Sequence, residues 1–180
     1  MSSGFYDRAS AGQPLLNPAR KEIYKTWIAA GIWLVLIGIE STDWLSAGNT
    51  SRILYPLFHW LAGVDPLSFM SWNFYIRKTG HVVGYFVLSW LLFRAWRCTI
   101  PAARARRWTV EWAGIAFFMT ALVACLDEWH QTFLPSRTGT LHDVLLDSTA
   151  AFAAQLMIFL WFYVRRRGLP GPLRGSSVVK

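Results

Sequence analysis

The stretch DEWHQTFLPSRTGTLHDVLLD, residues 127–147, holds four of the ten acidic residues and two of the four histidines of a chain that is 54% hydrophobic. Carboxyl and imidazole groups transfer protons, and burial or neighbouring charges shift their pKa values toward the range where they act as acids and bases. Ionisable groups are costly in an apolar environment and are often functional there. This stretch is therefore the first candidate for a binding or catalytic site.

Helical spacing groups these side chains with others. Residues three, four or seven positions apart share one face of a helix, and three sets of polar residues have this spacing. The sets are Lys78, His81 and Tyr85; Asp127 and Gln131; and Asp143 and Asp147. Each set is predicted to point to one side of its helix, so that all three can face a common interior.

The remaining composition is typical of an integral membrane protein. Mean hydropathy is +0.30, and only 16% of the residues are charged, which is too apolar for an ordinary soluble domain. Four apolar segments are long enough to cross a hydrocarbon layer of about 30 Å: residues 26–45, 74–96, 108–126 and 144–164. Segment 53–64 is too short to span. The expected fold is all-α, with four transmembrane helices in a bundle and one short interfacial or re-entrant helix in the first outer loop.

Basic residues orient these segments. Fourteen of the eighteen Lys and Arg residues precede the first segment, join the second to the third, or follow the fourth. The positive-inside rule then places both termini in the cytoplasm. Anchoring to lipid head groups accounts for the net charge of +8, and we expect no nucleic-acid partner. The chain is divided into a cytoplasmic segment 1–25, a membrane domain 26–164 and a basic tail 165–180, which is expected to be mobile.

This topology brings polar residues from all four helices to the extracytoplasmic end of the bundle. Arg137, in the loop PSRTG before the last helix, carries a guanidinium group suited to a bidentate grip on a carboxylate or phosphate. The candidate functional cluster comprises Glu40, Lys78, His81, Tyr85, Asp127, Glu128, Gln131, Arg137, Asp143 and Asp147.

Two elements of the sequence resemble the VanZ-like family of small bacterial membrane proteins. KTGHVVGY (78–85) is similar to a Lys-x-x-His-x-x-x-Tyr pattern of that family, and DEWHQTFLPSR (127–137) with DVLLD (143–147) is similar to a second one. The chain departs from the family at Ser136, where Gly is frequent, and at Asp147, where Asn is frequent. The resemblance implies a multi-pass protein of the bacterial cytoplasmic membrane with a role at the cell envelope. It links the chain to resistance to the glycopeptide teicoplanin but implies no defined reaction.

Three interpretations of the cluster remain open, and they leave open whether the protein is an enzyme. The cluster can bind a membrane lipid or another anionic amphiphile, such as a cell-envelope precursor, with Lys78 and Arg137 at the head group. It can belong to a membrane enzyme acting on a lipid-linked phosphate. SRTGTLHDVLLD (136–147) resembles the Ser-Arg-x5-His-x3-Asp element of type 2 phosphatidic acid phosphatases, but His142 stands one residue early. The cluster can also be a structural lock whose ion pairs only fix helix packing.

No cofactor is expected from the sequence. His81, His130 and His142 could supply metal ligands together with the acids, but no pair has a recognised spacing such as His-Glu-x-x-His. We therefore predict no metal centre. The sequence leaves the oligomeric state open.

Overall fold

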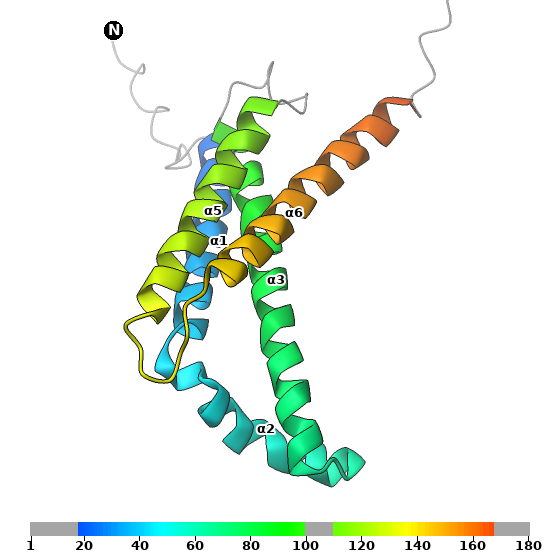
Figure 1. Cartoon of the computed structure of the whole chain (residues 1–180). Coiled ribbons are helices and arrows are strands. Elements are labelled where there is room, and N and C mark those ends of the chain that lie inside the picture. Colours follow the sequence, from blue (N-terminus) through cyan, green and yellow to red (C-terminus); the bar gives the residue numbers. More distant parts are fainter. Residues whose placement is uncertain (1–17, 100–109, 168–180) are drawn as a thin grey trace, which may run out of the picture.

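The computed structural model describes residues 18–99 and 110–167, and within these ranges the chain is helical and contains no strand. The elements are α1 (Pro18–Glu40), the 3-10 helix η1 (Asp43–Leu45), α2 (Ala47–Ala62), α3 (Pro66–Thr99), α5 (Val110–Gln131) and α6 (Leu141–Arg167) (Figure 1). This confirms the predicted all-α fold. Most of the predicted N-terminal segment and of the C-terminal tail lies outside the described residues.

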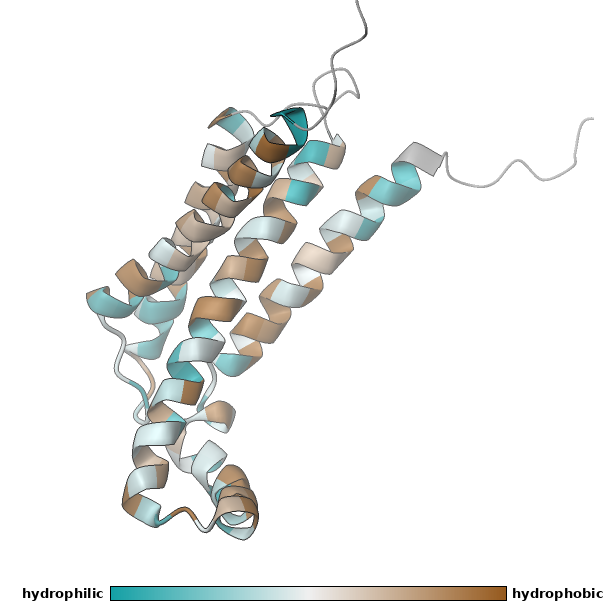
Figure 2. Cartoon of the chain, turned by 90° about the vertical axis from the view of Figure 1, so that its right-hand side faces the viewer, coloured by the Kyte–Doolittle hydropathy of each residue, from teal (hydrophilic) through white to brown (hydrophobic). Residues whose placement is uncertain are grey.

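Three helices are long and apolar enough to cross a membrane, over Arg20–Glu40, Val110–Gln131 and Leu141–Arg167. They correspond to the first, third and fourth predicted segments. The second predicted segment lies within α3, which is not among the three helices that qualify by hydropathy. Figure 2 shows apolar residues concentrated along the middle of the long helices, with hydrophilic residues toward their ends and part-way along α3.

Helix α3 starts eight residues before the predicted position 74, because its first turn is well capped. The Asp65 carboxylate accepts hydrogen bonds from the backbone N–H groups of Leu67 and Ser68, both at 3.0 Å, and Pro66 occupies the first helical position. Both features favour a helix start. The apolar pattern did not reveal this start, because Ser68, Ser71 and Asn73 interrupt it.

The short helix predicted at 53–64 is present as α2 but begins earlier, at Ala47, and ends at Ala62. Gly63 caps it with a φ of 63°, which glycine adopts easily. Helix α2 packs against the first half of α3 and forms a helical hairpin with it (Figure 1). Phe69 of α3 contacts the ring of Tyr55 at 5.4 Å between centroids. Asn73 donates to the Ala47 carbonyl at 3.1 Å and to the Ser51 hydroxyl at 2.9 Å. The hairpin is thus held by both apolar and polar contacts.

Helix α3 is the central element and packs against α1, α2, α5 and α6. Its crossing with α6 is close because α6 presents small residues there, with Ala151 fully buried. Ser89 donates to the Ala151 carbonyl at 3.0 Å, and Gln155 donates to the Ser89 hydroxyl at 2.8 Å. Gln155 of α6 thus forms hydrogen bonds with the neighbouring helix α3. Beyond the crossing, α6 diverges from α3 (Figure 1).

We expect Ala151→Leu to destabilise the protein, because the added side chain has no room at the α3–α6 crossing. Overpacking a tight core contact costs about 1–3 kcal/mol. The melting temperature of the detergent-purified variant should fall clearly below that of the wild type. Ala153→Leu is the matched control, since Ala153 is exposed two residues away. Equal melting temperatures for the two variants would contradict the packing described here.

Candidate functional site

A cavity of about 170 Å³ lies part-way along α3, where α1 and α5 end and α6 begins. Its lining mixes basic, acidic and aromatic side chains from α3, α5, α6 and the loop between the last two. The lining residues are Phe74, Arg77, Lys78, His81, Glu128, Gln131, Ser136, Arg137, Thr138 and Asp143. Six of the ten residues predicted for the functional cluster line this cavity: Lys78, His81, Glu128, Gln131, Arg137 and Asp143.

Lys78 and His81, two basic residues of α3, each face an acidic residue of α6. Lys78 forms an ion pair with Asp143, and both side chains are partly exposed. Nδ1 of His81 lies 3.6 Å from Oδ2 of Asp147. The Asp147 side chain is completely buried, and neither of its carboxylate oxygens accepts a hydrogen bond from the described residues. The predicted helical spacing of Lys78 and His81, and of Asp143 and Asp147, therefore corresponds to contacts between α3 and α6.

Asp127 is the centre of a hydrogen-bond chain that links three helices. Its Oδ2 accepts from the Tyr85 hydroxyl at 2.8 Å and from the Gln131 amide at 3.2 Å. The same Gln131 nitrogen donates to the Ser41 hydroxyl, just beyond the end of α1, at 3.2 Å. The sequence did not single out Ser41, and its only signal is its position next to Glu40.

Glu128 is fixed by the loop that follows its own helix. One of its carboxylate oxygens accepts from the Thr140 backbone N–H at 2.9 Å. Gly139 makes this approach possible, since a Cβ atom there would lie 2.0 Å from the Glu128 carbonyl oxygen. The loop is therefore pinned onto the last turn of α5. No sequence pattern pointed to the Thr140 contact, because it is made by the backbone.

Arg137 has different partners from the carboxylate or phosphate that the sequence favoured. One terminal nitrogen donates to the carbonyl oxygens of Glu40, Thr42 and Leu45, at 2.6, 3.0 and 2.9 Å. Carbonyl groups at a helix end lack intrahelical donors, so Arg137 satisfies the end of α1 and the turn after it. The residue is only 7% exposed. Burial lowers the pKa of its guanidinium group, which still keeps its charge at neutral pH.

Glu40 lies against α3 at a glycine of the KTGHVVGY element. A Cβ atom on Gly80 would be 2.6 Å from the Glu40 carboxylate, and one on Gly84 would contact Ile37. Glu40 also interacts electrostatically with Arg77. Arg77 lines the cavity and was missed in the sequence, although it stands four residues before His81 and shares its helix face.

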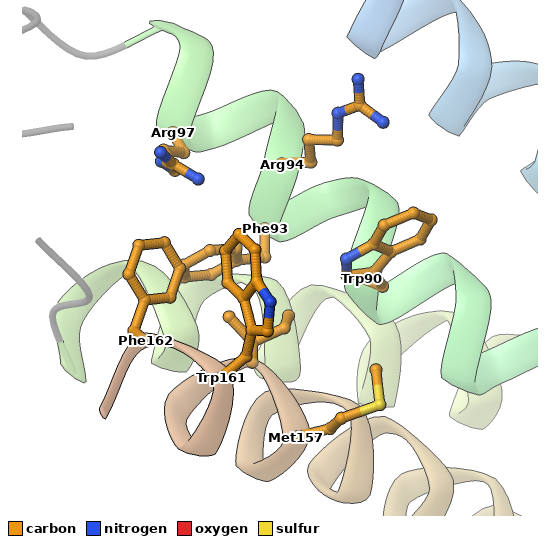
Figure 3. Close-up of a pocket in the computed structure, with 8 residues that line it drawn as sticks. Trp90, Phe93, Arg94, Arg97, Met157, Trp161 and Phe162 are labelled. Atoms are coloured by element: carbon orange, nitrogen blue, oxygen red, sulfur yellow. The ribbon is translucent and has the colours of Figure 1, made fainter. Parts of the chain in front are cut away.

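A larger cavity of about 420 Å³ lies between the other ends of α3 and α6 and has a different character. It is lined mainly by large apolar side chains with Arg94 and Arg97, and contains no acid or histidine. Figure 3 shows Trp161 and Phe162 of α6 facing Phe93 of α3, while Arg94 extends away from them. This groove lacks the acid–base groups of the smaller cavity.

One further group of side chains comes close together at the smaller cavity. His81, Asp127 and Glu128 each present a donor atom, and these atoms lie within 4.8 Å of one another. His130 and His142, the other histidines considered in the sequence, are exposed and do not belong to this group.

Arg137→Ala should lower the stability of the protein, because the carbonyl oxygens of Glu40, Thr42 and Leu45 would lose their donor. Hydrogen bonds to charged groups contribute about 1.5–3 kcal/mol each in net terms, so the melting temperature should drop by several degrees. Arg52→Ala, at an exposed position of α2, is the control for loss of a positive charge. A stable Arg137→Ala variant would show that the end of α1 does not depend on this side chain.

One comparison with known proteins identifies the family of the chain. A family model described as VanZ/LLP1 matches residues 26–163, which include α3, α5 and both elements KTGHVVGY and DEWHQTFLPSR. No curated protein and no solved structure matches the chain. Since the matched region covers most of the 180 residues, the chain belongs to the VanZ/LLP1 family.

Proposed function

We propose that this VanZ/LLP1 protein binds the anionic head group of a membrane amphiphile in the smaller cavity, at the extracytoplasmic end of a four-span bundle. The observation that carries the proposal is Arg77. Its guanidinium group lines the cavity beside Lys78 and Arg137, yet within the described residues it has no hydrogen-bond partner. A partly buried cation with unused donors fits a ligand that supplies carboxylate or phosphate oxygens.

The depth of the cavity favours a lipid-like ligand. In this proposal α3 spans the membrane together with α1, α5 and α6. Sixteen residues separate Lys78 from Arg94, which corresponds to about 24 Å along a helix. A hydrocarbon core is about 30 Å thick. If Arg94 reaches the cytoplasmic head groups, Lys78 and the cavity lie near the boundary between the outer acyl chains and their head groups. A lipid could therefore enter from the side.

Apolar side chains beside the cavity suit the tail of such a ligand. Phe74 lines the cavity and is exposed. Leu141 and Leu145 are exposed on the first two turns of α6, the part of the helix that carries Asp143. A head group held at Arg77 and Lys78 could place its hydrocarbon chain along these residues, which bulk lipid would otherwise cover.

The orientation rests on the charge distribution. Fourteen of the eighteen basic residues belong to segments that this topology places in the cytoplasm. The cavity would then open to the outer leaflet of the bacterial cytoplasmic membrane, where cell-envelope precursors are used. The link to teicoplanin resistance stays a prediction of the family resemblance.

A membrane enzyme acting on a lipid-linked phosphate is the second candidate. One observation favours it: Oδ2 of the buried Asp147 carboxylate lies 3.6 Å from Nδ1 of His81. A carboxylate in this position orients an imidazole and stabilises its protonated form, as in catalytic triads.

The Lys78–Asp143 ion pair and the Asp127 hydrogen-bond chain would also support a purely structural role.

Binding of short-chain lipids tests the proposal directly. We expect the purified protein to bind dioctanoyl phosphatidic acid at least tenfold more tightly than dioctanoyl phosphatidylcholine, as measured by native mass spectrometry. Arg77→Gln should weaken phosphatidic acid binding about tenfold, since a charged hydrogen bond contributes about 1.5–3 kcal/mol.

Arg52→Gln provides the matched control, because Arg52 is exposed on α2 and does not line the cavity. Its affinity for phosphatidic acid should equal that of the wild type. If both variants lose affinity equally, or if the wild type does not distinguish the two lipids, the cavity is not an anionic head-group site.

A further inference from the structure

We propose that His81, Asp127 and Glu128 bind a divalent transition-metal ion, of the Zn²⁺ or Mn²⁺ class, at the inner wall of the cavity. The proposal goes beyond amphiphile binding and does not depend on it. It departs from the sequence-based prediction that the chain has no metal centre. An imidazole nitrogen with two carboxylate oxygens suits these ions, and three protein ligands leave a coordination position open to the cavity.

The three ligands come from two helices packed against each other. His81 is on α3, while Asp127 and Glu128 are adjacent on the last turns of α5. Their donor atoms lie within 4.8 Å of one another. Tetrahedral ligands at about 2.1 Å from a zinc ion are about 3.4 Å apart, so binding requires these separations to shrink by at most about 1.4 Å. Rotation of the side chains can supply this movement.

Each carboxylate is held by one oxygen and keeps the other available. Oδ2 of Asp127 accepts from Tyr85 and Gln131, and Oε2 of Glu128 accepts from the Thr140 amide. Within the described residues, the second oxygen of each group accepts no hydrogen bond and is not among the buried, unsatisfied atoms. Carboxylate ligands of metal ions are commonly held in this way by outer hydrogen bonds.

Asp147 supplies an independent observation. Its carboxylate is fully buried with no hydrogen-bond partner for either oxygen in the described chain, and it points to Nδ1 of His81 at 3.6 Å. A histidine that binds a metal through one ring nitrogen usually donates its other N–H to a carboxylate or carbonyl group. Asp147 is placed to accept that proton, which would give the buried oxygen a partner when the ion is bound.

The charge balance of the cluster also favours a divalent cation. With every acid ionised and His81 neutral, as metal ligation requires, the five acids Glu40, Asp127, Glu128, Asp143 and Asp147 outnumber the cations Arg77, Lys78 and Arg137 by two. Isolated charges in a low-dielectric interior are costly unless they are paired. One divalent ion would neutralise the group.

The test is a metal titration of the purified full-length protein after treatment with EDTA, with no phospholipid added. Isothermal titration calorimetry is carried out with Zn²⁺ and, separately, with Mn²⁺. For at least one of these two metals, the titration should show one ion bound per chain. His81→Gln and Glu128→Gln should each reduce the affinity at least tenfold. Asp147→Asn should reduce it about 10–100-fold, the usual effect of changing an outer partner of a histidine ligand.

Glu128→Gln keeps an oxygen for the Thr140 amide, so it provides a folded variant even if His81→Gln is unstable. His130→Gln and His142→Gln are matched controls at exposed histidines and should bind metal as the wild type does. Arg77→Gln should keep the one-to-one stoichiometry, which separates this result from lipid binding. No binding of either metal by the wild type, or loss of binding only in the control variants, would overturn the proposal.

Discussion

The arrangement of the helices depends on supplying polar partners for the carboxylates that lie between them. Glu128 and Asp147 are buried and Asp127 is half-buried, and these acids come from two helices. Little water is available to solvate the buried carboxylates. Tyr85, Gln131, the Thr140 amide and His81 face these groups. Because these partners belong to α3, α5 and the loop before α6, satisfying the acids also fixes how these segments are arranged.

Small residues determine how closely the helices can approach to make these contacts. Gly80 leaves room for the Glu40 carboxylate, and Gly139 leaves room for the loop against the Glu128 carbonyl. Ala151 has the same role at the crossing of α3 with α6. The charged cluster and the small-residue contacts thus depend on each other. The small residues allow the helices to approach closely, and the polar groups define the register between the helices.

The sequence predicted much of this arrangement because helical spacing is a local property. The stripe of Lys78, His81 and Tyr85 does face Asp143, Asp147 and Asp127. The early start of α3, the hairpin with α2 and the partners of Arg137 were not predicted. They depend on capping and on contacts between distant segments, which hydropathy does not report. Arg77 was overlooked because its position in the cavity lining, with Glu40 as an electrostatic neighbour and no hydrogen-bond partner among the described residues, is visible only in three dimensions.

The most direct test of this arrangement is a double-mutant cycle on Tyr85 and Asp127, which lie on different helices. The free energy of unfolding is measured in detergent for the wild type, Tyr85→Phe, Asp127→Asn and the double variant. A direct hydrogen bond to this half-buried carboxylate predicts a coupling energy of about 1 kcal/mol or more. Effects that add within about 0.3 kcal/mol would show that the two side chains do not interact, and would contradict convergence of the helices on this cluster.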